Sequence, residues 1–107
     1  MLPRSSAKRE SYLHSLGEAN TRYGNGRLDA DAPGADEPPD HYRYDPANPV
    51  PSRGGHSCCT PDVAPVGPLD QAEIEERADV LVYSTPALQQ PIEVTGERAF
   101  CHPCFAR

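Results

Sequence analysis

The most constrained part of this chain reads Tyr42-Arg-Tyr-Asp-Pro-Ala-Asn-Pro-Val-Pro-Ser-Arg-Gly-Gly55. Its prolines at positions 46, 49 and 51 fix φ and remove backbone donors, so neither a helix nor a central strand fits here. Each proline also pushes the residue before it toward an extended conformation. Tyr42 and Tyr44 share one face if that short piece is a strand. We therefore predict a strand end that leads into a stiff loop, the proline loop (residues 42–55), which needs a larger body to lie against.

The supply of core-forming side chains is small for a chain of 107 residues, which allows one small domain. Seven Leu, two Ile, six Val and two Phe make 17 residues, about 16% of the chain, below the roughly 20% expected of chains that fold alone. Thirteen Pro and eight Gly add turns rather than core, and Trp is absent. We expect either partial disorder or a piece of something larger.

Acidic residues outnumber basic ones, and the formal net charge is −6. This balance argues against a nucleic-acid partner, because phosphate contacts need clustered Lys and Arg. Six carboxylates crowd one stretch: Asp29, Asp31, Asp36, Glu37, Asp40 and Asp45. A solvated acidic loop is the interpretation we favour. A cation site is the alternative, but Asp29 and Asp31 lack the spacing of an EF-hand loop, and we expect no calcium.

Membrane and export signals are missing from the sequence. No run of about 18 apolar residues exists, so we predict no membrane span. Residues 1–10 carry basic side chains with no apolar segment after them, which is not the pattern of a secretory signal. A cytoplasmic location is therefore expected, where the four cysteines are thiols rather than disulfides.

Short β-type segments separated by turn-rich loops predict an all-β sandwich. The turn dipeptide Asn25-Gly26 is expected to join the first two strands, and residues 30–40 are expected to be loop. The expected strands are Tyr12–His14, one opening at Arg27-Leu28, His41–Tyr44, Asp79–Thr85 and Ile92–Thr95. One short helix is predicted over Asp70–Arg77, with Asp70 as cap and Glu73 completing a capping box.

Gly55-His56-Ser57-Cys58-Cys59 resembles the nucleophile elbow Gly-x-Ser-x-Gly, except at its last position. The elbow also needs a strand before it and a helix after it, whereas here the proline loop precedes and Thr60-Pro61 follows. Ser57 is therefore expected to be a loop serine. His14 and His41 would be bases only if a nucleophile and an orienting acid met them in space, and nothing in the sequence brings these together.

Cys58, Cys59, Cys101 and Cys104, with His56 and His102 nearby, raise the possibility of zinc. A Cys-x-x-Cys pair is half of a zinc ribbon, but adjacent cysteines rarely both reach one tetrahedral metal. A thioredoxin-like redox role lacks the βαβ setting. We expect free thiols, no cofactor and no metal.

A set of motifs nevertheless resembles one family. They are Tyr12-Leu13-His14-Ser15, Asn25-Gly26-Arg27-Leu28, Glu37-Pro38-Pro39-Asp40, Tyr44-Asp45-Pro46-Ala47-Asn48-Pro49-Val50-Pro51, Gly54-Gly55, Asp79-Val80-Leu81-Val82-Tyr83-Ser84-Thr85 and Val94-Thr95-Gly96. In this order and spacing they resemble the hydrolases of the cocaine esterase and X-Pro dipeptidyl-peptidase family, over residues 10–96.

The resemblance implies part of the family's C-terminal, non-catalytic jelly-roll β-sandwich, of galactose-binding-like shape, which packs against an α/β-hydrolase domain. It assigns no catalytic, cofactor-binding or metal-binding residue here, because the family's Ser–Asp–His triad lies upstream of the jelly roll. Residues 1–9 and 97–107 do not resemble the family, which suggests a truncated or frameshifted product. We therefore predict an incomplete sandwich from a serine hydrolase, inactive alone; the alternative is a carbohydrate- or protein-binding module.

Overall fold

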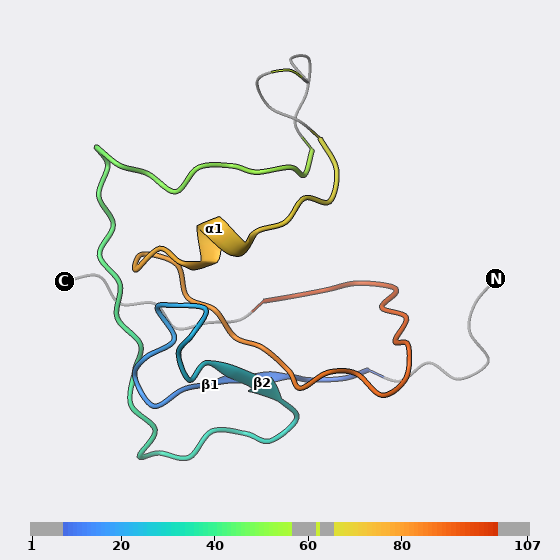
Figure 1. The fold of residues 1–107 in the computed structure, drawn as a ribbon. Helices are drawn as coiled ribbons and strands as arrows, with labels where there is room; N and C mark the ends of the chain where they lie inside the picture. The colour runs from blue at the N-terminus through green and yellow to red at the C-terminus, as the bar shows by residue number, and fades with distance from the viewer. Residues whose placement is uncertain (1–7, 57–61, 63–65, 101–107) are drawn as a thin grey trace.

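The computed structural model describes residues 8–56, 62 and 66–100, and most of them are neither helix nor strand (Figure 1). Three regular elements are present in this described part: β1 (Tyr12–His14), β2 (Arg27–Asp29) and α1 (Ala72–Glu75). Long loops extend from the small sheet, and the proline loop leads away from it past α1 (Figure 1). The architecture is therefore β-rich and open.

β1 and β2 form an antiparallel pair in the register Tyr12↔Asp29, Leu13↔Leu28 and His14↔Arg27. Both strands lie where the sequence predicts them. The turn between them is different, because the chain reverses at residues 21–24, where the Gly24 amide donates to the Thr21 carbonyl at 3.2 Å. The prediction of a turn at Asn25-Gly26 is therefore wrong.

Asn25 does not form the turn; its side chain instead links the two ends of the loop between β1 and β2. Its Oδ1 accepts hydrogen bonds from the backbone N–H groups of Leu16 and Glu18, each at 3.1 Å. The next residue, Gly26, passes so close to the Val82 carbonyl that an added Cβ would collide with it. Glycine is required here because another backbone approaches.

The segment around Val82 and Ser84 pairs with the sheet but does not become a strand. Ser84 forms one parallel bridge with Arg27, and the Leu28 amide donates to the Ser84 carbonyl at 3.0 Å. The Val82 amide donates to the Ala19 carbonyl at 2.7 Å. A full strand over Asp79–Thr85 is therefore a wrong prediction, because the three-residue β2 offers too short an edge for a longer ladder.

No strand forms at His41–Tyr44 or at Ile92–Thr95, although both lie within the described residues. Tyr44 is 66% exposed and Val94 is 63% exposed. A strand needs a neighbour for its backbone groups, and among the described residues no backbone hydrogen bond links either segment to another part of the chain. With Asp79–Thr85, three of the five predicted strands are therefore wrong.

Helix α1 lies inside the range predicted for it. The N-cap residue is Gln71 rather than the predicted Asp70, although Asp70 Oδ1 accepts the Ala72 amide at 2.9 Å just before the helix. The predicted capping box does not form, because Glu73 makes an ion pair with Arg53 of the proline loop at 2.8 Å. Helix α1 is therefore linked to the proline loop through Arg53, whose carbonyl also accepts a hydrogen bond from Gln71 Nε2 at 2.6 Å.

Apolar burial is slight. Ala19 is the one apolar residue that is fully buried in the described part of the chain. The chain exposes 9710 Å², where a compact monomer of its 11.6 kDa exposes roughly 5,800 Å². Its radius of gyration is 16.6 Å, against about 13 Å for a compact chain of 107 residues. Polar contacts, rather than a hydrophobic core, hold this arrangement.

Candidate functional site

Apart from Ala19, the buried residues in the described part are polar. His14 and Ser15 are each 3% exposed; His14 is the last residue of β1, and Ser15 follows it. Their long-range partners come from β2 and from the loop of residues 30–40, and Tyr83 joins them through its hydrogen bond with Asp40. We call these residues the polar cluster: His14, Ser15, Asp29, Glu37, Asp40 and Tyr83.

Asp40 is the hub of one half of the cluster. Its Oδ1 accepts hydrogen bonds from Ser15 Oγ at 2.7 Å and from the Ala19 amide at 3.0 Å. Its Oδ2 accepts one from the Tyr83 hydroxyl at 2.6 Å. Burial opposes ionisation of Asp40, but these donors outweigh it and hold the pKa of Asp40 below its ordinary value. Burial and the same bond raise the pKa of Tyr83, so the phenol stays neutral.

His14 is the centre of the other half. Its Nδ1 lies 2.9 Å from Glu37 Oε2, and its Nε2 lies 2.8 Å from Asp29 Oδ1 and 2.6 Å from the Asp31 carbonyl. The hydrogen bond with Glu37 raises the pKa of His14 above its ordinary value despite the cost of burial. The same bond lowers the pKa of Glu37.

Ser15, His14 and Asp40 are the residue types of a catalytic triad, but their geometry is not that of one. Ser15 Oγ donates to Asp40 and accepts from the Gly17 amide at 3.1 Å, so it does not face the imidazole. Both nitrogens of His14 face acceptor oxygens, which leaves no lone pair for accepting a proton. This arrangement positions three segments of the chain and does not activate a nucleophile.

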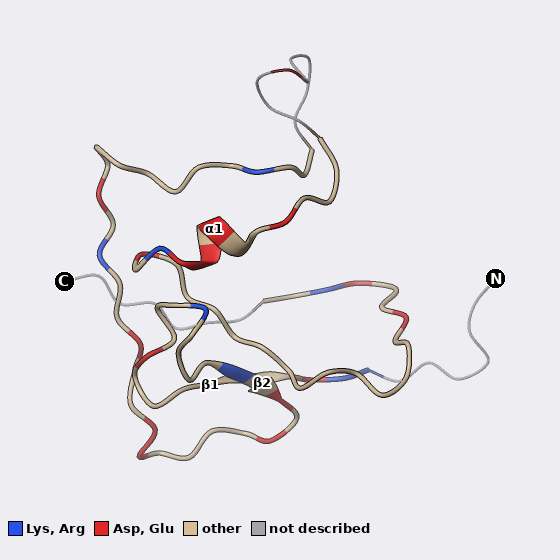
Figure 2. Cartoon of the chain, in the orientation of Figure 1, with Lys and Arg blue, Asp and Glu red and all other residues tan. Residues whose placement is uncertain are grey.

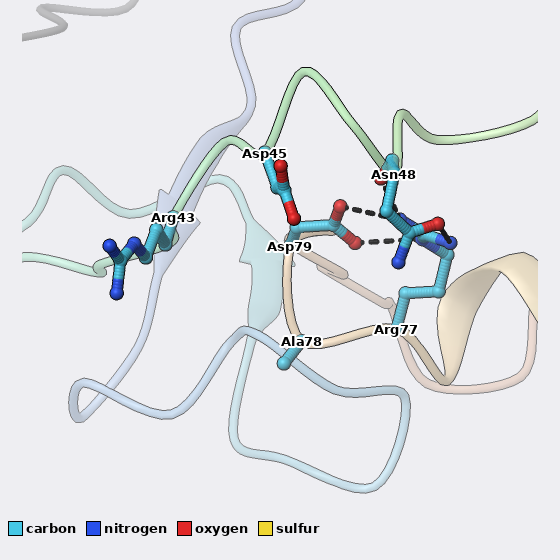
Figure 3. Close-up of a pocket in the computed structure, with 6 residues that line it drawn as sticks. All are labelled: Arg43, Asp45, Asn48, Arg77, Ala78 and Asp79. Carbon is cyan, nitrogen blue, oxygen red and sulfur yellow. Dashed lines mark hydrogen bonds and ion pairs between the residues drawn. The ribbon is translucent and has the colours of Figure 1, made fainter.

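A second set of contacts holds the proline loop (Figure 3). Arg77 makes a two-point contact with Asp79, with Nε at 2.8 Å from Oδ1 and Nη2 at 2.8 Å from Oδ2. The same Nη2 donates to the Asn48 carbonyl at 2.7 Å. The hydrogen bond with Arg77 lowers the pKa of Asp79. Arg43 lines the same recess but points away from this pair (Figure 3).

The far end of the proline loop is fixed by backbone geometry. Gly55 and Gly67 exchange hydrogen bonds of 2.8 and 3.0 Å, and Gly54 and Gly55 have φ values of 76° and 75°. A Cβ on Gly54 would also meet the Gly67 carbonyl. The predicted closure of the loop on Gly54-Gly55 is therefore confirmed, and its supports include Arg77 and the bridge to Gly67.

Most of the residues singled out for chemistry lie outside the described part: Ser57, Cys58, Cys59, Cys101, His102 and Cys104. His41 and His56 are described and exposed. Within residues 8–56, 62 and 66–100, no group of three or more His, Cys, Asp or Glu side chains is arranged to hold a metal ion. None of the helices in that part is long or apolar enough to cross a bilayer.

The acidic loop is the part that sequence reasoning misjudged. Asp and Glu are spread along the loop after β2 and on α1 (Figure 2). Asp29, Glu37 and Asp40, however, are half-buried hydrogen-bond acceptors rather than solvated charges. The pair His14-Ser15 at the end of β1 could have indicated such acceptors, because buried polar side chains need hydrogen-bond partners.

No protein-family model matches the chain, and no solved structure matches it. One curated relative is cocaine esterase from Rhodococcus sp. (strain MB1 Bresler), which is 47% identical over 89 residues. The match covers 79% of this chain and 14% of the esterase. The chain therefore spans about one seventh of the length of that relative. Through this segment, the chain is related to cocaine esterase, a hydrolase.

Proposed function

We propose that this chain corresponds to part of the C-terminal β-sandwich of a serine hydrolase resembling cocaine esterase and X-Pro dipeptidyl-peptidase, and that it has no hydrolytic activity alone. The observation that carries the proposal is the 47% identity to cocaine esterase over 79% of the chain. In the parent protein the reaction is hydrolysis of an ester or amide through an acyl-serine intermediate. The partner is an α/β-hydrolase domain that brings the nucleophile, the base and the acid.

The contacts of the described residues favour a structural rather than a catalytic role for this chain. His14 and Ser15 have all their polar atoms engaged in holding loops together. The chain also exposes far more surface than a compact monomer of its mass, about 9710 against roughly 5,800 Å². Several large apolar side chains face solvent, among them Leu88 at 60% and Ile92 at 53% exposure. In the proposed parent protein they would pack against other parts of the molecule.

Two measurements test the proposal. The purified chain is treated with a fluorophosphonate probe and assayed with p-nitrophenyl acetate; neither labelling nor hydrolysis above a buffer blank is expected. The chain is then exchanged for the matching segment of the Rhodococcus esterase, and this chimera is expected to hydrolyse the same substrate. Labelling of the chain alone, or a folded chimera that is inactive, contradicts the proposal.

A further inference from the structure

Three separate segments meet at the His14 ring. His14 ends β1, Asp29 ends β2, and Glu37 belongs to the loop of residues 30–40. The contacts from the ring to Asp29 and Glu37 are 2.8 and 2.9 Å. Glu37 also accepts the Ser15 amide at 2.8 Å through its other oxygen. One ring therefore joins the sheet to a loop about twenty residues further along.

The contacts require both ring nitrogens to be protonated. A neutral imidazole has one N–H and one lone pair, and the lone pair would face either the Glu37 carboxylate or the oxygens of Asp29 and Asp31. Water cannot relieve that repulsion readily, because the side chain is only 3% exposed. The other cation nearby is Arg27, which contacts Asp29 Oδ2 at 3.1 Å from an exposed position. Arg27 forms its ion pair with Asp29, and its charge also helps to lower the pKa of Glu37, whose hydrogen-bonded cationic partner is His14.

We propose that His14, Asp29 and Glu37 form a proton-dependent latch, closed when the His14 ring carries two protons and open when it loses one. Closure holds the loop of residues 30–40 against the β1–β2 pair. Since Asp40 lies at the end of that loop, opening also loosens its contacts with Ser15. The device is independent of the proposed function, because it needs only the contacts within this chain.

The pH window of the latch follows from its groups. The pKa of His14 is raised above its ordinary 6.5, so its contribution is complete below that value and is lost as pH rises through the folded pKa. The pKa values of Asp29 and Glu37 are lowered from 3.8 and 4.5. Their contribution is present above those values and is lost as pH falls through the folded ones. The latch is therefore closed in mildly acidic solution, and it opens as pH rises through the folded pKa of His14, which lies above 6.5.

Nitrogen-15 NMR of the histidine rings in the full chain tests the latch. His14→Gln identifies the signals of His14 among the four histidines. We expect both His14 nitrogens to resonate as N–H in mildly acidic solution, and the titration midpoint of His14 to lie above 6.5. The Ser15 amide shift should follow the same midpoint, because its acceptor is Glu37. A His14 midpoint at or below 6.5 overturns the proposal.

Glu37→Gln supplies the second arm, because it removes the charge and keeps the size of the side chain. We expect the His14 midpoint to fall, and the Ser15 amide to lose its dependence on that titration. Asp36→Asn is the matched control, since it removes a charge from the exposed neighbouring position. Equal shifts in the two variants show a general charge effect and overturn the latch. If Glu37→Gln abolishes the β1–β2 cross-peaks, Asp29→Asn takes its place with the same expected direction.

Discussion

Replacing Tyr83 with Phe removes one hydroxyl and keeps the ring. The hydroxyl donates to Asp40 Oδ2 at 2.6 Å, while Asp40 Oδ1 retains its bonds from Ser15 Oγ and the Ala19 amide. The variant therefore isolates a single charge-assisted hydrogen bond, the one that joins the segment of residues 79–85 to the polar cluster. No cavity forms beyond the volume of one oxygen atom.

The size of the effect follows from that bond. A hydrogen bond to a charged group contributes about 1.5–3 kcal/mol to stability. Asp40 and Tyr83 are half-buried, so water can replace part of the lost contact. We therefore expect a loss of about 1–2 kcal/mol, which corresponds to roughly a 5- to 30-fold larger opening equilibrium. The pKa of Asp40 should rise at the same time, because one of the donors that lowers it is gone.

Native-state amide hydrogen exchange measures this locally. The amides of Ala19 and Val82 report on the cluster, since the first donates to Asp40 and the second to the Ala19 carbonyl. Both should exchange roughly 5- to 30-fold faster in Tyr83→Phe. Tyr44→Phe is the control, because Tyr44 is 66% exposed. Unchanged exchange in Tyr83→Phe, or an equal change in the control, refutes the reasoning.

Two further substitutions test how the segment around Val82 and the proline loop are held in place. Gly26→Ala places a methyl group against the Val82 carbonyl and should detach that segment from β2 at a cost of about 1–3 kcal/mol, seen as lost protection of the Val82 amide; Gly34→Ala, in open space, should leave it intact. Arg77→Gln should release the part of the proline loop around Asn48 and remove NOEs between that part and the Arg77 region, whereas Arg43→Gln should not. Retained NOEs in Arg77→Gln would count against a role for that side chain in holding the loop.

The sequence predicted correctly those elements that depend on interactions between residues close together in the chain. β1, β2 and α1 lie within or at the segments whose residue patterns predict a strand or a helix. The closure of the proline loop at Gly54-Gly55 was also predictable, because only glycine tolerates positive φ freely. The strand predicted at Ile92–Thr95 does not form, because a β-type sequence pattern shows only that a segment favours a strand and does not provide a neighbouring strand to pair with.

The polar cluster could not be predicted, because its members are up to about seventy residues apart in the chain. Asp40 and Glu37 read as members of a solvated acidic run, and nothing local marks them as acceptors for Ser15 and His14. Their roles depend on the loop folding back beneath β1. That arrangement depends on long-range contacts, which composition and periodicity do not encode residue by residue.

The sequence alone determined that this chain has little apolar material, a rigid proline loop and a few short β-type segments, since these follow from side-chain chemistry and from the fixed φ of proline. It also carries the relationship to cocaine esterase. Only the tertiary structure decided which carboxylates are structural. Asp29, Glu37 and Asp40 acquire partners because buried N–H and O–H groups need acceptors, and the fold brings those particular oxygens within reach.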